Sequence, residues 1–168
     1  MAVRLVRPMA ADLGRVAVVR VSGSGRNVGK TTLVTHLIAW LTERGYRVSA
    51  VKRTHHPVPA DRAGSDTELM AAAGAKRVAF VGPDGVVERS EPLPLDEVVE
   101  RLSADADVVV VEGYRDASLG VQLHLMGEPP AQVAMRAADG LFVRSVSADD
   151  LDAIGAFVEQ SLAVRVAN

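Results

Sequence analysis

The residues with the clearest capacity for chemistry lie in one glycine-rich stretch that ends in Gly29-Lys30-Thr31-Thr32. Glycine permits positive φ angles and lets main-chain N–H groups come close to an anion. A lysine at this position can contact terminal phosphates, and a threonine hydroxyl can bind Mg²⁺. The stretch therefore predicts a loop that binds the phosphates of a nucleotide, with contacts from Gly23, Ser24, Gly25, Arg26, Asn27, Val28, Gly29, Lys30, Thr31 and Thr32.

The spacing of this loop departs from the common one by one residue. Five residues separate Gly23 from Gly29, whereas the common pattern has four, and Ser24 stands where the first glycine of that pattern would be. A glycine-rich turn before an ordinary helix, with an exposed Lys30, is the alternative. We favour the phosphate-binding loop because a buried strand precedes it and an amphipathic helix follows it, which is the context that the motif requires.

The hydrophobic pattern places this loop between regular elements. Residues 15–22 form a short stretch that is rich in β-branched residues, which is typical of a strand buried on both faces. An amphipathic helix is expected to follow the loop and to end near Gly45. Its apolar face consists of residues at helical spacing: Leu33, Val34, Leu37, Ile38 and Leu41.

The rest of the chain predicts further strands and helices in alternation. Strands are expected over 46–52, 107–113, 120–126 and 140–146, and helices over 67–75, 94–103 and 148–163. A capping box of Ser147 and Asp150 is expected to start the last helix. Residues 76–90 predict a hairpin around a Gly-Pro-Asp-Gly turn, and residues 53–66 predict a loop.

Strands that alternate with helices favour a mainly parallel sheet covered on both faces. We therefore expect an α/β fold of three layers, like that of P-loop nucleotide-binding proteins, with a mixed sheet to which the hairpin adds antiparallel pairing. One domain is expected over residues 1–168, in which residues 1–15 form either an edge strand or a loose tail. Ligands of such sheets bind where the carboxyl ends of the parallel strands meet.

Composition excludes several classes of function. The chain has 168 residues, a formal net charge of −2 and no cysteine. The absence of cysteine excludes a disulfide framework, a thiolate metal site and a cysteine nucleophile. The charge balance argues against nucleic acid or a membrane surface as a partner. Because the first residues lack the apolar run of a signal peptide, a cytoplasmic location is expected.

Two carboxylates flank the strand expected over 107–113. The direction of this strand decides which of them lies near the phosphate loop. Asp107 and Glu112 lie at opposite ends, roughly 16 Å apart at the rise of a strand. If this strand is parallel to the one before the phosphate loop, Glu112 lies at the edge of the loop. We therefore expect Glu112 to meet Mg²⁺ and, with Lys30, to act in catalysis; a solvated strand-end acid is the alternative.

The loop after the second strand brings more polar residues to the same edge. Asp61 and Asp66 could bind Mg²⁺ directly or through water, although Asp66 could equally be the N-cap of the next helix. His55 and His56 are adjacent in an extended segment and point to opposite sides, so they do not predict one zinc site. One of them could contact phosphate instead. The expected magnesium ligands are therefore Thr31, Asp61, Asp66 and Glu112.

From residue 16 to about residue 116 the chain resembles the molybdopterin-guanine dinucleotide biosynthesis protein B family (MobB). The resemblance lies in the phosphate loop followed by "RGYRVSAVKRTHH", "DRAGSDTELMAAAGA" and "DVVVVEGYRD". It implies a GTP-binding protein with Mg²⁺ and weak GTPase activity, a homodimer, that acts as an adapter for a nucleotidyltransferase which attaches GMP to molybdopterin. It also implies that His55 and His56 belong to the nucleotide site.

Two features differ from the family pattern. Only Asp61 stands where the family has an acidic pair, and the longer phosphate loop is similar to that of dethiobiotin synthetase. No Asn-Lys-x-Asp segment is present to recognise guanine, so GTP follows from the resemblance. An ATP-dependent small-molecule kinase or ligase and a non-catalytic nucleotide-binding module are therefore the alternative functions.

Overall fold

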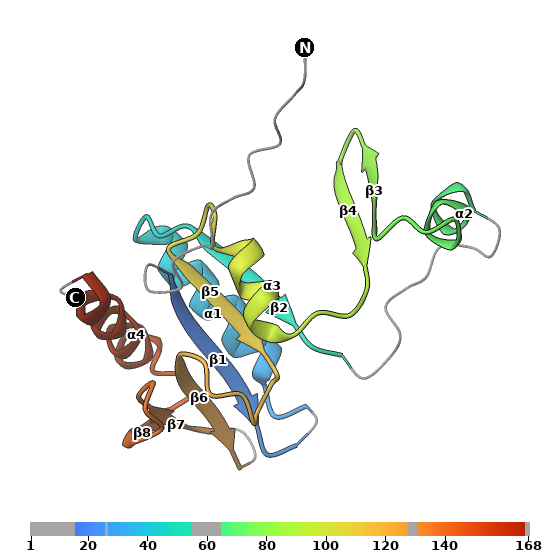
Figure 1. Cartoon of the computed structure of the whole chain (residues 1–168). Coiled ribbons are helices and arrows are strands. Elements are labelled where there is room, and N and C mark those ends of the chain that lie inside the picture. Colours follow the sequence, from blue (N-terminus) through green and yellow to red (C-terminus); the bar gives the residue numbers. More distant parts are fainter. Residues whose placement is uncertain (1–15, 26, 55–64, 128–130, 167–168) are drawn as a thin grey trace. The chain divides into compact units, whose positions relative to one another are not determined.

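The computed structural model describes residues 16–25, 27–54, 65–127 and 131–166, with side chains up to residue 162. The chain divides into two compact units, shown in Figure 1. Unit 1 comprises Met1–Arg53 and Val98–Asn168, and unit 2 comprises Thr54–Glu97. The single domain expected over 1–168 thus contains two units, and the edge strand or tail expected over 1–15 lies outside the described residues.

Unit 1 is built on a six-stranded sheet with the order β2-β5-β1-β6-β7-β8. Four strands run parallel: β1 (Ala17–Gly23), β2 (Val48–Lys52), β5 (Val108–Glu112) and β6 (Val121–Met126). Two strands extend the sheet in antiparallel fashion: β7 (Gln132–Arg136) and β8 (Phe142–Ser147). Because β1 and β5 lie at the centre of a sheet that is covered on both faces, their valine-rich sequences are buried almost throughout.

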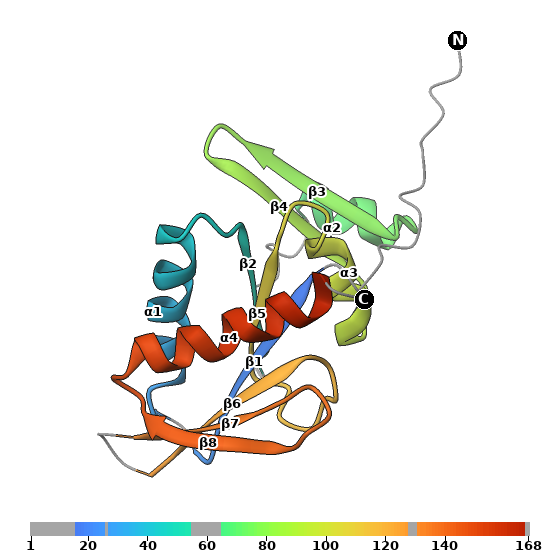
Figure 2. The same cartoon turned by 90° about the vertical axis from the view of Figure 1, so that its left-hand side faces the viewer.

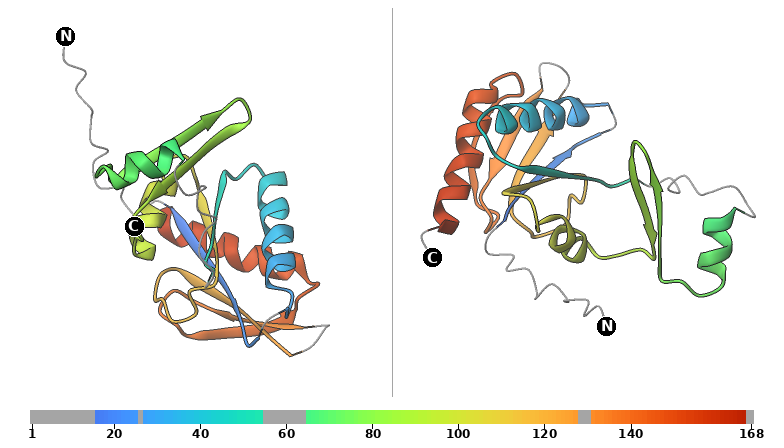
Figure 3. Two further views of the ribbon diagram at one scale, coloured as in Figure 1. Left: turned by 90° about the vertical axis from the view of Figure 1, so that its right-hand side faces the viewer. Right: turned by 90° about the horizontal axis from the view of Figure 1, so that it is seen from above.

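Helices cover both faces of this sheet, as the sequence predicts. Helices α1 (Lys30–Glu43) and α4 (Leu151–Val166) lie on one face, and the right-hand view of Figure 3 shows α3 (Leu95–Leu102) on the other. Figure 2 shows α4 crossing the strands beside α1. On the α3 side, the Oγ of Ser49 on β2 donates to the Leu102 carbonyl at 3.2 Å. The expected mixed, mainly parallel sheet with helices on both faces is confirmed.

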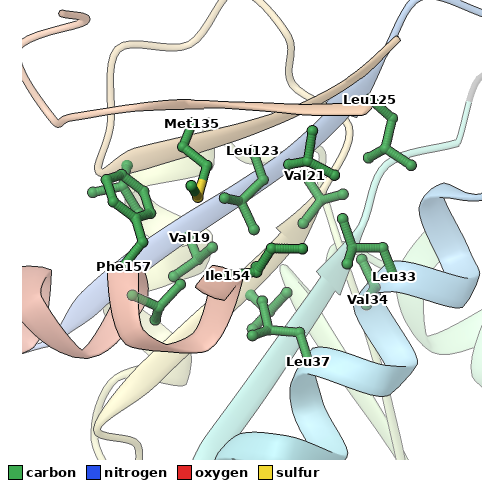
Figure 4. Close-up of a cluster of buried hydrophobic side chains, with 14 of the residues drawn as sticks. Val19, Val21, Leu33, Val34, Leu37, Leu123, Leu125, Met135, Ile154 and Phe157 are labelled. Carbon is green, nitrogen blue, oxygen red and sulfur yellow. The ribbon is translucent and has the colours of Figure 1, made fainter. Parts of the chain in front are cut away.

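The main hydrophobic core fills the space between the sheet and the pair α1 and α4. Figure 4 shows side chains of β1, β6 and β7 pointing toward those of α1 and α4. Leu37 of α1, Leu123 of β6 and Ile154 of α4 are completely buried. The predicted apolar face of α1 is therefore its core face, and its packing fixes where the helix begins at the end of the phosphate loop.

Unit 2 contains α2 (Asp66–Ala72) and a two-stranded antiparallel sheet of β3 (Arg77–Gly82) and β4 (Gly85–Ser90). The predicted hairpin is confirmed, with Pro83 and Asp84 in the turn. However, the hairpin forms a sheet of its own, so the expectation that it adds antiparallel pairing to the main sheet is wrong. That pairing comes from β7 and β8.

Two further details correct the sequence analysis. Strand β7 was not predicted. The cap of α4 is Asp150 alone, whose Oδ1 accepts the main-chain N–H of Ala153 at 3.0 Å. Ser147 is the last residue of β8, and its Oγ accepts from the N–H of Asp149. Among the residues that the structure describes, no helix is long and apolar enough to cross a membrane.

Candidate functional site

The phosphate loop connects the carboxyl end of β1 to the first residue of α1. Asn27 has a φ of 59° and Gly29 a φ of 88°, so the chain enters the helix through left-handed conformations. A Cβ atom added at Gly23 would lie 2.7 Å from Cγ2 of Val28. Glycine at position 23 therefore permits the close return of Val28 over the end of the strand, and glycine at 29 permits the turn into the helix.

The amino end of α1 is built to receive an anion. Its N-cap, Gly29, has no side chain to cap the helix, and the first intrahelical bond runs from the N–H of Leu33 to the Gly29 carbonyl at 2.9 Å. The N–H groups before Leu33 have no partner within the helix. They carry the positive end of the helix dipole, and no acidic residue lies in the first turn. Phosphate is the kind of ligand that this arrangement favours.

Lys30 places a positive charge over the same loop. Its Nζ donates to the main-chain carbonyl of Gly25, so the side chain folds back across the loop. Ser24 holds the other side of the loop, because its N–H donates to the Leu125 carbonyl of β6 at 3.1 Å. The loop is therefore fastened to the neighbouring strand while its charged lysine stays half-buried above it.

Glu112 meets the start of α1 directly. The Oγ1 of Thr31 donates to the Glu112 carboxylate, at 3.0 Å from Oε2 and 3.2 Å from Oε1. The Nζ of Lys52 lies 3.4 Å from Oε1 of Glu112 and 3.4 Å from Oγ1 of Thr31. Glu112 is only 9% exposed. The nearly buried carboxylate of Glu112 therefore contacts both the Thr31 hydroxyl and the Lys52 ammonium group at the edge of the loop.

The strand register explains why these groups meet. Glu112 of β5 is paired with Val21 of β1 and with Lys52 of β2, so all three lie on the sheet face that α1 covers. Asp107 lies before the other end of β5 and binds the guanidinium of Arg47 at 2.7 Å, which lowers the pKa of its carboxyl group. The predicted placement of Glu112 at the loop, and of Asp107 away from it, is confirmed.

A polar pocket of about 400 Å³ opens over these residues. It is lined by Asn27, Gly29, Lys30, Thr31, Thr32, Lys52 and Glu112. Six of the seven were either in the predicted loop or predicted as the acid that meets magnesium. Lys52 was not among the predicted site residues. Its place in the site follows from its pairing with Glu112, a register that the sequence does not reveal.

The donor set of this pocket fits Mg²⁺. Mg²⁺ takes few protein oxygens and keeps several waters, and the Thr31 hydroxyl and Glu112 carboxylate present two kinds of oxygen donor that lie 3.0 Å apart. Zinc prefers closed sets of nitrogen or sulfur ligands. Among the described residues there is no group of three or more His, Asp or Glu side chains that could hold a metal.

The described residues that line this pocket include no further predicted metal ligand. Arg26, His55, His56 and Asp61 lie outside the described residues. Asp66 is the first residue of α2 in unit 2, and its N-cap alternative is wrong, because the Oγ of Ser65 accepts the N–H of Glu68 at 3.3 Å. A magnesium role for Asp66 stays a prediction.

The opposite face of β1 carries a polar cluster that the sequence analysis did not identify. Nδ1 of His124 lies 2.8 Å from the Oγ of Ser22, which also accepts from the side-chain amide of Gln122 at 3.1 Å. Burial lowers the pKa of His124, and the positive charges of Arg115, Arg136 and Lys30 lower it further. In the sequence, the only sign of this cluster is that Gln122 and His124 alternate with apolar residues along β6, as Ser22 does on β1.

Comparisons with known proteins agree with this geometry. The family model described as molybdopterin guanine dinucleotide synthesis protein B (MobB) matches residues 16–132. Two curated relatives are called molybdopterin-guanine dinucleotide biosynthesis adapter protein. The one from Haemophilus influenzae is 34% identical over 91 residues, which are 52% of this chain and 51% of the relative. The one from Escherichia coli is 32% identical over 98 residues, 52% and 53% of the two chains.

The chain therefore spans about half the length of these curated relatives. A crystal structure described as molybdopterin-guanine biosynthesis protein B superposes with a TM-score of 0.60 and covers 86% of this chain and 98% of that chain. At 23% sequence identity this similarity shows the fold alone.

Proposed function

Because the chain belongs to the molybdopterin guanine dinucleotide synthesis protein B (MobB) family, we propose that it is a GTP-binding adapter with slow GTPase activity in molybdenum cofactor synthesis. The observation that carries the nucleotide part is the Thr31–Glu112 hydrogen bond beside Lys30 at the amino end of α1. The adapter part rests on the names of the relatives, which are called adapter proteins of molybdopterin-guanine dinucleotide biosynthesis.

In this proposal each group of the pocket has one task. The main-chain N–H groups at the start of α1 and the Lys30 ammonium bind the phosphate oxygens. Thr31 and Glu112 hold Mg²⁺, which supplies charge stabilisation on the phosphates when bound. Lys52 balances the charge of Glu112. The main-chain N–H groups, Lys30 and the bound Mg²⁺ would stabilise negative charge on the transferred phosphoryl group, which is the main source of catalysis in such reactions.

The composition of the pocket supports a slow rate of hydrolysis. Rapid GTPases add an arginine that stabilises the transition state and a glutamine that orients the attacking water. Among the described residues that line the phosphate pocket there is neither. A slow rate suits a protein that presents nucleotide to a partner, and the partner proposed here is the nucleotidyltransferase that couples GMP to molybdopterin.

The homodimer belongs to the same proposal, and the hairpin of unit 2 supports it. Phe80 is paired with Val87 and Val81 with Val86, so both faces of the ribbon carry apolar side chains. These four side chains are 64–72% exposed. Exposed apolar patches mark protein interfaces more often than free surface. Sedimentation velocity should give a dimer, and Val87→Lys should give a monomer that still binds nucleotide.

Titration calorimetry with GTP and with ATP, each with Mg²⁺, tests the nucleotide part. GTP should bind more tightly than ATP, and Lys30→Ala should weaken binding of both by at least tenfold without a matching loss of stability. Lys76→Ala, which removes an exposed lysine from unit 2, is the matched control and should bind like the wild type. A preference for ATP would favour a small-molecule kinase or ligase, and binding of neither nucleotide would refute the proposal.

A further inference from the structure

A second pocket, of about 460 Å³, lies on the other side of the phosphate loop. The phosphate pocket opens toward β5 and β2, whereas this one opens toward β6, β7 and the turn between β8 and α4. The two pockets share Gly29 and Thr32, and both lie within unit 1. A molecule whose phosphates occupy the loop can therefore extend its remaining part into the second pocket.

The walls of this second pocket are mostly apolar and already in place. The apolar side chains are those of Val28, Leu33, Leu125, Ala131 and Ala148, and the polar side chains of Thr32, His36 and Asp149 complete the lining. Leu33, Leu125 and Ala131 are at most 5% exposed, because they are also part of the hydrophobic core. The N–H of Ala148 donates to the Ala131 carbonyl at 2.8 Å and ties the two loops that form the far wall. A preformed apolar slot with few polar groups is typical of a site for a flat ring.

One acidic side chain, Asp149, lines this pocket. The neighbouring Asp150 carries out the structural task at the start of α4, because it caps the N–H of Ala153. Asp149 contributes only main-chain contacts there, from its N–H to Ser147 and from Leu151 to its carbonyl. In the described part of the chain its carboxylate makes no hydrogen bond or ion pair. The helix cap therefore does not explain an aspartate at this position.

We propose that the second pocket holds the nucleobase and that Asp149 selects guanine. This inference rests on the proposed nucleotide site and names the residue that gives it base specificity. Guanine presents two adjacent donors, the N1–H and the 2-amino group, to the two oxygens of a carboxylate, which accepts only. Such paired, charge-assisted hydrogen bonds are stronger and more specific than single neutral ones. The missing Asn-Lys-x-Asp segment is thereby replaced by a carboxylate from the β8–α4 turn.

Adenine does not fit the same carboxylate. At the corresponding positions it has an unprotonated ring nitrogen and no 2-amino group, so the acceptor at N1 faces an acceptor of the protein. A pair of matched hydrogen bonds to a base edge gives about 1–3 kcal/mol of discrimination, which is about 5- to 150-fold in affinity. Because Asp149 is exposed, we expect the lower half of this range, about tenfold in favour of GTP.

Asp149→Asn is the decisive variant, because it keeps the shape of the side chain and exchanges one acceptor oxygen for an amide donor. By titration calorimetry with Mg²⁺, its affinity for GTP should fall about tenfold while its affinity for ATP changes little. The same variant should gain affinity for XTP, whose base carries an acceptor in place of the 2-amino group. Asp150→Asn is the matched control, since it makes the same change of charge one residue away and asparagine caps helices equally well.

Inorganic triphosphate separates this inference from the function on which it rests. Wild type and Asp149→Asn should bind triphosphate equally, whereas Lys30→Ala should lose it. If the wild type binds GTP but Asp149→Asn retains the preference for GTP and gains nothing for XTP, the role of Asp149 is refuted and the phosphate site stands. If the wild type binds neither GTP nor triphosphate, the phosphate site is refuted, and the base pocket with it.

Discussion

Replacing Glu112 with glutamine should uncouple nucleotide binding from magnesium. Glu112 is 9% exposed, receives a hydrogen bond from Thr31 at 3.0 Å and lies 3.4 Å from the Lys52 ammonium. Glutamine keeps the size of the side chain and one acceptor oxygen for the Thr31 hydroxyl. It removes the negative charge and exchanges the second acceptor oxygen for an amide donor, so the variant tests the electrostatics and not the packing.

The expected effects on folding and on binding differ in size. The side chain of Lys52 is 62% exposed, so its ion pair with Glu112 contributes at most about 1 kcal/mol to stability. The Thr31 hydrogen bond loses its charged acceptor, a further change of about 1 kcal/mol. At the metal, the lost contact is charge-assisted and contributes about 1.5–3 kcal/mol. This corresponds to about 10- to 150-fold weaker binding of Mg²⁺-GTP.

The assay is the dissociation constant of GTP, measured in Mg²⁺ and again in EDTA. The wild type should bind much more tightly in Mg²⁺, and in Glu112→Gln the two constants should approach each other. Asp107→Asn is the matched control, because it removes the same charge from the other end of β5, where the carboxylate is engaged by Arg47. Equal behaviour of the two variants would refute the assignment of Glu112 to the metal.

Three other changes test the fold that holds this site. Leu37→Ala removes a completely buried side chain of α1 and should lower the free energy of unfolding by about 2–5 kcal/mol in urea titrations. Gly120→Ala should destabilise by about 2–5 kcal/mol, because φ is +70° and the new Cβ would lie 2.1 Å from the Val18 carbonyl oxygen. Since burial lowers the pKa of His124, the unfolded chain takes up a proton near pH 6.5 that the folded protein does not. Wild-type stability should therefore fall between pH 8 and pH 6, and by less in His124→Gln. A His124→Gln curve as steep as that of the wild type would assign the pH dependence to another group.

The fold was predictable where local pattern decides the structure. Alternating strands and helices, the apolar face of α1 and the hairpin at Gly82–Gly85 all follow from periodicity and turn residues. Strand β7 could not be predicted in this way. Its five residues are too few to show a clear alternation of polar and apolar side chains, and its pairing depends on β6 and β8. Which sheet the hairpin joins was equally unpredictable, since residue types specify a turn but not the edge that the turn approaches.

The same distinction applies to the site. Lys30 and Thr31 belong to a motif that is local in sequence, and Glu112 follows from the direction of a parallel strand, so the sequence predicted that all three lie at the loop. Asp149 carries no motif, because it comes near the loop only through the packing of α4 and β8 beside α1. Its neighbour Asp150 fits the pattern of a helix cap, so only Asp150 could be predicted to have a role at this turn.

The extra residue of the phosphate loop is tolerated because the two ends of the loop are fixed independently. Gly23 is held in β1 beneath Val28, and α1 is held by Leu33 and Leu37 in the core. Lys30 and Thr31 therefore lie at the start of α1 although the loop has one residue more than the common pattern. Leu125 connects this loop to the second pocket, since its carbonyl accepts from Ser24 while its side chain lines the apolar wall. A base in that pocket and phosphates on the loop would thus contact one continuous framework, in which strand β6 sets the distance between them.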